Sequence, residues 1–231
     1  MLEDLGLRHQ LPDGDRVAIL VGPNGSGKSF YLKAIASGVK GKRHLSVISN
    51  TAHDRFVGMR GFSRISAGRS GPSPKTIVKR AIARTIGEPD SRFYQIGRIL
   101  EYCNYRPRFG FQITGISRHF SRRLLHNASL YQSDQDAIHA FLSNTDSREI
   151  IWIDSRASAF SLSLARDFAT VLRCEPELRK RSLLRDIKVY LQREDGEIIA
   201  LTHASSGELA LISSLIFLIT QSDRDSIILI D

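Results

Sequence analysis

The stretch Gly22-Pro-Asn-Gly-Ser-Gly-Lys28-Ser29 decides the fold, because it matches the phosphate-binding loop G-x-x-x-x-G-K-[ST] at every fixed position. It follows the apolar run Val17-Ala-Ile-Leu-Val21 and precedes the helix-forming stretch Phe30-Tyr-Leu-Lys-Ala-Ile-Ala36. We therefore expect a buried strand, then the loop, then a helix. The glycines let the backbone wrap closely, so that successive N–H groups point at phosphate oxygens. The sequence predicts that this chain binds a nucleoside triphosphate.

Each part of the loop has an expected role. The ammonium of Lys28 would reach the β- and γ-phosphates, and the Ser29 hydroxyl would ligate Mg²⁺. The dipole of the following helix adds positive potential at its N-terminus, where the phosphates would lie. The remaining residues of the predicted nucleotide site are Gly22, Pro23, Asn24, Gly25, Ser26 and Gly27.

Length and composition describe an ordinary globular chain. Its 231 residues, 42% hydrophobic and 25% charged, suffice for one sizeable core or for a core with an inserted lobe. Cys103 and Cys174 lack a metal-binding or disulfide spacing, which predicts buried thiols in a reducing compartment. No signal-peptide pattern opens the sequence, and the apolar segment 209–220 is shorter than a membrane span. We expect a cytoplasmic protein without membrane attachment, in which this segment is a buried helix.

The net charge of +9 is unevenly distributed along the chain. Residues 52–123 carry 15 basic and 4 acidic side chains, a net charge of +11, whereas residues 124–231 carry 11 and 16, a net charge of −5. An excess of this size is typical of a surface that binds a polyanion such as nucleic acid. A lobe kept soluble by arginine would have the same composition, so the charge leaves both interpretations open.

Periodicity outlines the rest of the chain. A second strand is expected at 44–49, and the Gly, Ser, Arg and Pro residues of 58–74 indicate a mobile loop. Later elements are expected as helices at 77–86, 92–104 and 118–140 and as strands at 109–113, 149–153, 187–191 and 198–202. Trp152 is expected in the core. The predicted fold is α/β, with a nucleotide-binding core of residues 1–60 and 148–231 and a mostly helical, basic insertion at about 61–147.

The segment Ser226-Ile-Ile-Leu-Ile230-Asp231 is an apolar strand that ends in an acid. In P-loop proteins such a carboxylate holds Mg²⁺ beside the serine of the loop. A buried strand can end in aspartate for other reasons, but the position of this one, some 200 residues after a complete loop, favours the magnesium role. The sequence predicts Ser29 and Asp231 as the metal-binding residues, and Lys28 and Asp231 as the catalytic ones.

The segment His203-Ala-Ser205-Ser206-Gly207-Glu208 stands directly before the apolar stretch 209–220. With the two other motifs, it resembles the signature of ABC-type ATPases, and more specifically of the RecF and structural-maintenance-of-chromosomes group. The stretch Val47-Ile-Ser-Asn50-Thr-Ala-His-Asp54-Arg-Phe56 is also similar to the S-N-x-x-x-D-x-F segment of prokaryotic defence-associated ATPases. The resemblance covers residues 15–57 and 187–231.

The resemblance implies a P-loop NTPase core that binds ATP and Mg²⁺. It also implies a head-to-tail homodimer, in which Ser206, Gly207 and Glu208 of one subunit face the γ-phosphate held by the other. An ordinary helix cap at Ser205 or Ser206 would use the same residue types, but the order and spacing of the three motifs favour the signature. Further partners that the resemblance suggests are nucleic acid, bound through residues 52–123, and a nuclease or effector subunit in defence or repair.

In this family the aspartate of the last motif is followed by a catalytic glutamate, a D-loop and a switch histidine, which the sequence does not contain after Asp231. We therefore expect a fragment of a longer ATPase, with a degenerate, non-hydrolysing ATP-binding scaffold as the alternative. A nucleotide-binding subunit of a membrane transporter is a further alternative, although no convincing glutamine loop for a membrane partner is evident.

Overall fold

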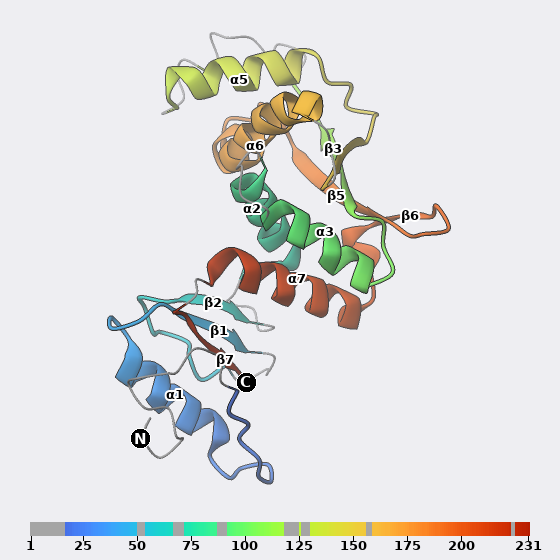
Figure 1. Ribbon diagram of the computed structural model, residues 1–231. Coiled ribbons are helices and arrows are strands. Elements are labelled where there is room, and N and C mark those ends of the chain that lie inside the picture. Colours follow the sequence, from blue (N-terminus) through green and yellow to red (C-terminus); the bar gives the residue numbers. More distant parts are fainter. Residues whose placement is uncertain are drawn as a thin grey trace. The chain divides into compact units, whose positions relative to one another are not determined.

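A computed structural model describes residues 17–49, 54–66, 72–86, 92–117, 125, 130–155, 159–222 and 225–231, without the side chains of 159–163. The chain divides into two compact units, which we call unit 1 (residues 1–72 and 221–231) and unit 2 (residues 73–220). Both units combine helices and strands (Figure 1), so the fold is a mixed α and β one, as the sequence predicted.

The described residues of unit 1 form a parallel sheet of three strands and one helix. Its strand order is β2 (Ser63–Ser66), β1 (Leu45–Ser49) and β7 (Ile227–Ile230). All five residues of β1 are buried, as expected for the central strand of a parallel sheet. Helix α1 (Lys28–Val39) packs its buried side, Ile35, Ala36 and Val39, against Val47 and Leu229 of the sheet. The helix after the loop and the strands predicted at 44–49 and 226–231 are confirmed.

The strand predicted at Val17–Val21 is wrong. These residues form no strand, and the side chains of Val17, Ile19 and Val21 are 80–92% exposed. Strand β1 has β2 on one edge and β7 on the other, and no strand in the described ranges pairs with residues 17–21 or with the second edge of β7. The apolar run has the composition of a buried strand, but burial requires a neighbouring strand and covering side chains, and the described residues provide neither for Val17, Ile19 and Val21.

The predicted mobile loop at 58–74 contains strand β2, so this expectation is wrong for Ser63–Ser66. The strand pairs in parallel with β1, and its Ile65 is buried. Asp54 holds the connection from β1, because its carboxylate accepts a hydrogen bond from the Phe56 N–H (2.8 Å) and pairs with Arg64 (3.1 Å). The aspartate and phenylalanine of the S-N-x-x-x-D-x-F segment are thus structural residues, and Phe56 is fully buried. Within residues 58–74, positions 67–71 lie outside the described residues.

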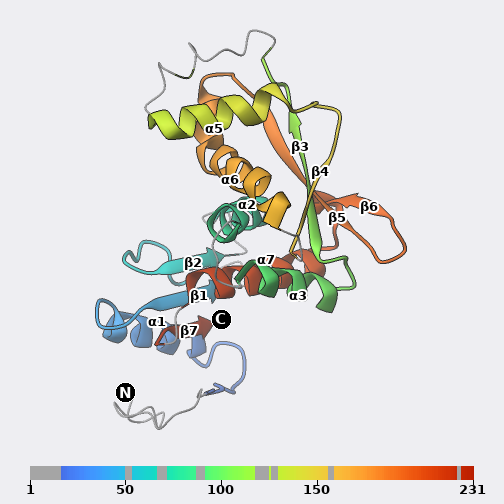
Figure 2. The same cartoon turned by 45° about the horizontal axis from the view of Figure 1, so that its top comes forward.

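Unit 2 is built on an antiparallel sheet of four strands. The order is β4 (Ile151–Asp154), β3 (Arg108–Thr114), β5 (Asp186–Gln192) and β6 (Ile198–Ala200). This sheet joins β3, from the predicted insertion, with three strands from the predicted core. Phe111 of β3 is fully buried, and its ring lies 4.8 Å from that of Phe168, which in turn lies 5.2 Å from that of Phe141. Figure 2 shows helices α5 (Gln132–Ser143) and α6 (Ala159–Lys180) on this side of the sheet.

The other helices of unit 2 are α2 (Pro74–Thr85), α3 (Arg92–Tyr102), the short 3-10 helix η2 (Leu201–His203) and α7 (Ser206–Gln221, whose last residue belongs to unit 1). Ser73 caps α2 by accepting a hydrogen bond from the Thr76 N–H (3.3 Å). The sequence analysis assigned no element to residues 159–180, where the structure has its longest described helix. Part of the helix predicted at 118–140 lies outside the described residues; α5 begins at Gln132.

Helix α7 is less buried than its apolar sequence suggested. Only one side, with Ile212, Ser213, Ile216 and Phe217, is buried, and Leu211 is 41% exposed. The prediction of a buried helix is therefore right for the helix and wrong for its complete burial, because α7 is packed on one side only. Of the two cysteines, Cys174 is buried and Cys103 is half-buried; burial raises the pKa of both thiols.

A chain of charged side chains ties α2 to α6 and β5. The Lys79 ammonium donates to both oxygens of Glu175 (2.6 and 2.7 Å) and lies 3.7 Å from Asp186, which also pairs with Lys75 (2.6 Å). Burial lowers the pKa of Lys79, although Glu175 counteracts this effect. Burial alone would raise the pKa of Asp186, but the hydrogen bond from Lys75 and the charges of both lysines hold it below its ordinary value. We call these four residues the lysine–carboxylate chain.

Trp152 is not a core residue, contrary to the sequence prediction. It alternates with the buried Ile153 along β4, so it points to the sheet face opposite Phe111 and is half-buried there. The Arg108 guanidinium lies 4.8 Å from the centre of its ring. A strand carries one residue in two on each face, and an apolar sequence does not reveal which face a helix covers.

Candidate nucleotide-binding site

The predicted phosphate-binding loop is exposed and leads directly into α1. Gly25 and Gly27 adopt φ values of 84° and 91°, which side chains other than glycine rarely tolerate. A Cβ on Gly22 would lie 2.8 Å from the Ser26 Oγ, because the loop curls back on itself. The first turn of α1 contains no acidic residue. These features leave the N-terminus of the helix accessible to an anion.

Lys28 folds back over the loop. Its ammonium donates to the carbonyl oxygens of Gly22 (2.7 Å) and Pro23 (2.9 Å). These carbonyls hold the positive charge above the turn. A phosphate could take their place as the hydrogen-bond acceptor after a small rotation of a flexible side chain, so this position suits the predicted role of Lys28 in contacting phosphates.

Ser29 and Asp231 meet, although 202 positions separate them in the sequence. The Ser29 Oγ donates to Asp231 Oδ1 at 2.7 Å. Ser29 lies in the first turn of α1, and Asp231 directly follows β7, where its N–H donates to the Ile48 carbonyl oxygen (2.9 Å). The parallel pairing of β1 with β7 thus brings the aspartate to the end of the sheet where α1 begins.

The second carboxylate oxygen of Asp231 is buried and has no hydrogen-bond partner among the described residues. A buried carboxylate oxygen without a donor is costly, and a bound cation would satisfy it. A serine hydroxyl and one carboxylate fit Mg²⁺, which commonly keeps several waters and phosphate oxygens as further ligands. No group of three His, Cys, Asp or Glu side chains in the described ranges could hold a metal ion by itself.

Ser205 and Glu208 form a reciprocal cap at the start of α7. The Glu208 N–H donates to Ser205 Oγ (3.2 Å), and the Ser205 N–H donates to Glu208 Oε2 (2.9 Å). The structure therefore shows the helix cap that the sequence analysis weighed against the signature. This cap leaves Ser206 and Gly207 exposed at the N-terminus of the helix. The loop and Asp231 belong to unit 1, whereas Ser205–Glu208 belong to unit 2.

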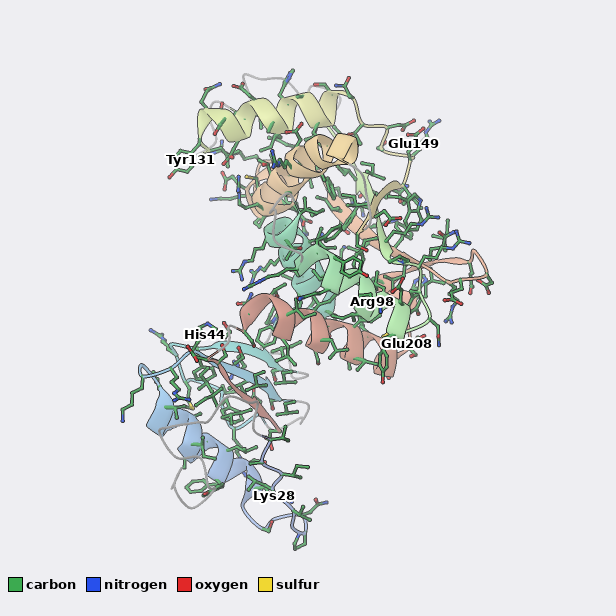
Figure 3. The ribbon with its side chains drawn as sticks, in the orientation of Figure 1. Lys28, His44, Arg98, Tyr131, Glu149 and Glu208 are labelled. Atoms are coloured by element: carbon green, nitrogen blue, oxygen red, sulfur yellow. The ribbon has the colours of Figure 1, made fainter. Side chains whose placement is uncertain are left out.

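Glu208 is further held by two residues that the sequence analysis did not single out. The buried Tyr105 donates from its hydroxyl to Glu208 Oε1 (3.0 Å), and Arg193 lies 3.7 Å from the same oxygen. Hydrogen bonds from Ser205, with smaller effects of Tyr105 and Arg193, hold the pKa of Glu208 below its ordinary value. Burial, and then the hydrogen bond to Glu208, raise the pKa of Tyr105 to about 12. Because both of its oxygens are engaged, Glu208 positions the N-terminus of α7 (Figure 3).

The basic segment 52–123 is divided between the two units. Several of its cations already have protein partners: Arg64 pairs with Asp54, Arg98 with Glu101, and Lys75 and Lys79 belong to the lysine–carboxylate chain. Arg55 and Arg60 of unit 1 and Arg80 and Arg84 of unit 2 are exposed. The cluster at residues 118–123 lies outside the described residues. Some of the basic side chains behind the net charge of +11 are thus paired with carboxylates of the protein and are not free to bind a polyanion.

Comparison with protein-family models, with curated proteins and with solved structures found no match. No helix in the described ranges is both long enough and apolar enough to cross a membrane. The likeness to ABC-type ATPases consequently depends on the three motifs and on the geometry of their residues.

Proposed function

We propose that this chain is an ABC-type, RecF-like ATPase domain that binds ATP with Mg²⁺ and dimerises head to tail around it. The hydrogen bond between Ser29 and Asp231 carries the proposal. Each of the two motifs predicts a magnesium ligand, and their side chains lie within hydrogen-bond distance of each other, as two ligands of one ion would. The unpartnered Asp231 Oδ2 beside them is the atom that the metal would satisfy.

In the proposed site, Ser29 and Asp231 would hold Mg²⁺, whose charge would offset that of the terminal phosphates. Lys28 would exchange its two carbonyl partners for phosphate oxygens. The N–H groups of α1 complete the anion site. Ser206 and Gly207, held at the exposed N-terminus of α7 by the Ser205–Glu208 cap, would contact the γ-phosphate bound by a second subunit. The exposed arginines of both units support action on nucleic acid. The resemblance to the RecF-like group is what suggests a defence or repair system.

Binding of ATP to single-site variants tests the site. We expect Lys28→Ala to abolish measurable ATP affinity in calorimetry, and Asp231→Asn to remove the part of the affinity that depends on Mg²⁺ while leaving metal-free binding unchanged. Lys42→Ala, which removes an exposed lysine of the same unit, is the matched control and should bind as the parent does. Unchanged ATP–Mg²⁺ affinity in Lys28→Ala would refute the assignment.

The dimer is tested separately by light scattering with ATP and Mg²⁺. Ser206→Arg should block ATP-dependent dimerisation without weakening ATP binding to the monomer. Ser143→Arg places the same side chain at the exposed end of α5 and should leave dimerisation intact. If Ser206→Arg dimerised normally, the signature would have no role across the dimer, and the residues would serve only as a cap.

A further inference from the structure

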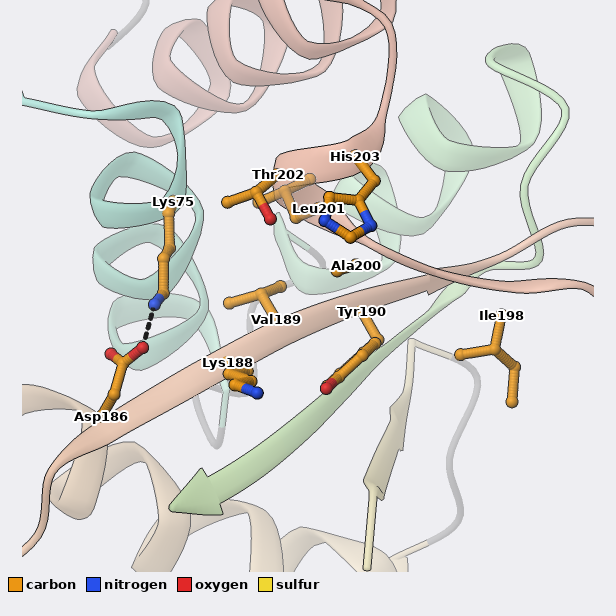
Figure 4. A pocket seen from close by; sticks show the side chains of 10 residues that line it. All are labelled: Lys75, Asp186, Lys188, Val189, Tyr190, Ile198, Ala200, Leu201, Thr202 and His203. Carbon is orange, nitrogen blue, oxygen red and sulfur yellow. Dashed lines mark hydrogen bonds and ion pairs between the residues drawn. The ribbon is translucent and has the colours of Figure 1, made fainter. Parts of the chain in front are cut away.

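A pocket of about 480 Å³ lies in unit 2, beside strand β5. Its volume is within the range of small-molecule sites. In Figure 4, Lys75 and Asp186 stand on one side of it, Thr202 and His203 of the η2 turn on another, and residues of β5 between them. None of these side chains belongs to the loop, to Asp231 or to the Ser205–Glu208 cap.

The charges around this pocket leave a positive excess. Lys75 and Asp186 belong to the lysine–carboxylate chain, whose two lysines and two carboxylates balance each other. Lys188 is exposed, and the described part of the chain offers it no hydrogen-bond or ion-pair partner. Among the described residues, its ammonium is therefore unpaired. A ligand that gives Lys188 an anionic oxygen would supply the missing partner.

Apolar and hydrogen-bonding groups share the rest of the lining. Tyr190 and Ile198 provide an aromatic ring and an aliphatic surface, and the Tyr190 hydroxyl is already oriented by its hydrogen bond to Gln112 (2.9 Å). The Thr202 hydroxyl and the His203 ring add polar groups, and neither has a side-chain hydrogen-bond or ion-pair partner in the described ranges. An aromatic face next to a free lysine is the combination that binds the base and the phosphate of a nucleotide.

We infer that this pocket binds a nucleotide unit, with the phosphate on Lys188 and the base against Tyr190. The unit could be a residue of a single-stranded nucleic acid or a free nucleotide, because both present the same chemistry. If the ligand is a single-stranded nucleic acid, the inference rests on the proposed action on nucleic acid. If the ligand is a free nucleotide, the inference does not depend on that proposal. The η2 turn that forms one wall leads within two residues to Ser205, so a ligand here would contact the approach to α7.

An extended peptide fits this place less well. Strand β6 pairs with residues 190–192 of β5, and an added strand would have to continue that pairing along residues 186–189. The chain leaves the strand direction at Leu201 and folds into η2, which packs against β5 and occupies that line. What remains is a pocket and not an open strand edge.

The experiment uses the full chain carrying Lys28→Ala, so that the predicted ATP site does not contribute. Fluorescence anisotropy with a labelled 12-nucleotide oligothymidylate, and calorimetry with AMP, measure the two sources of ligand. Loss of ATP binding at the loop and loss of ligand at this pocket are then separate results. If the parent chain failed to bind ATP while the oligonucleotide still bound at the pocket beside β5, the proposed ATPase function would be refuted and this inference would not.

We expect Lys188→Ala to weaken binding of whichever probe binds by about tenfold, and Lys188→Glu by more. For the oligonucleotide, the slope of log affinity against log salt should fall by about 0.7 for the one lost phosphate contact. Lys180→Ala removes an exposed lysine at the end of α6 and should leave affinity and slope unchanged. Tyr190→Leu should weaken binding about tenfold and Tyr190→Phe much less, because the ring provides the stacking surface.

Saturable binding of AMP, with no higher affinity for the oligonucleotide, would identify a free nucleotide as the ligand. A higher affinity for the oligonucleotide would identify single-stranded nucleic acid as the ligand. Circular dichroism confirms that each variant is folded. The inference is overturned if neither probe binds, if Lys188→Glu and Tyr190→Leu bind as the parent does, or if an acidic peptide binds here and both nucleotide probes do not.

Discussion

The parallel sheet of unit 1 and the antiparallel sheet of unit 2 differ in how completely they bury their apolar residues. In unit 2, Phe111, Ile113, Ile187 and Leu191 of the two central strands are fully buried. In unit 1, β1 is buried to a similar degree, but Ile228 and Ile230 of β7 are 43% and 60% exposed, and Val17, Ile19 and Val21 are 80–92% exposed.

The unit that buries more of its apolar side chains is not the unit that contains the candidate site. Unit 2 closes one face of its sheet with helices and an aromatic cluster. The residues proposed to bind ATP and Mg²⁺ belong to unit 1, which leaves apolar side chains exposed. Exposed apolar groups contribute little to the free energy of folding. We therefore expect unit 2 to provide most of the stability of the chain and unit 1 to gain most from ligand binding.

The largest effect should come from truncating the aromatic cluster of unit 2. Phe111→Ala removes a fully buried ring that contacts Phe168, and should lower the free energy of unfolding by about 3–5 kcal/mol. Ile19→Ala in unit 1 should change it by less than about 0.5 kcal/mol, because the side chain is already exposed. Urea unfolding followed by circular dichroism measures both. Equal losses in the free energy of unfolding would show that residues 17–21 are buried in solution, and the proposed difference in burial between the two units would be wrong.

A somewhat smaller effect is expected from the buried ion pair of unit 2. Glu175→Gln removes the carboxylate that holds the buried Lys79 ammonium at 2.6 and 2.7 Å and leaves it only Asp186 at 3.7 Å, which should cost about 3 kcal/mol in the same urea experiment. Adding Lys79→Met should recover most of the loss, because the uncompensated charge is then gone. Glu177→Gln, which affects the partly exposed pair between this α6 residue and Arg181 just after the helix, is the control and should change stability little.

If the double variant were no more stable than Glu175→Gln, the loss would come from packing and not from the unpaired charge. The stability of unit 2 would then depend on how these side chains pack and not on their charges. The two units would differ only in how much apolar surface they bury.

The smallest effect concerns the cap of α7. Ser205→Ala should cost about 1 kcal/mol, the usual value for an N-cap. The pKa of Glu208 is lower in the folded chain than its ordinary value, so its contribution to stability is present above that ordinary value and is lost as the pH falls through the lowered one. The stability difference between the parent and Glu208→Gln should accordingly be seen at pH 7 and shrink below about pH 4.

Urea unfolding at a series of pH values measures this difference. A stability difference that persisted unchanged at low pH would mean that the charge of Glu208 does not hold the cap. The Tyr105→Phe variant, which removes one of its donors, should shift the loss towards higher pH.

Much of the fold could be predicted from local patterns, and the failures share a cause. The alternation of Phe109, Phe111 and Ile113 depends on neighbouring residues, and the strand predicted there is confirmed. The helix predicted at 77–86 is also confirmed, although it begins earlier, at Pro74. The predicted burial of Trp152 and of residues 17–21 depended on which distant element covers them, and both predictions are wrong. The candidate magnesium residues could be predicted because each belongs to a sequence motif. The contacts of Tyr105 and Arg193 with Glu208 could not be predicted, since neither residue belongs to a motif.

The sequence by itself determined the glycine-rich loop, the start of α1 and α7 and the period-two strands, because hydrogen bonding and side-chain alternation within a few residues specify them. The tertiary structure alone decided that Ser29 meets Asp231, that Glu208 is held by Tyr105, and that Lys188 and Tyr190 line a pocket. These contacts join residues far apart in the chain. They depend on strand order and on which face of a sheet is covered, and neither is written in a local pattern.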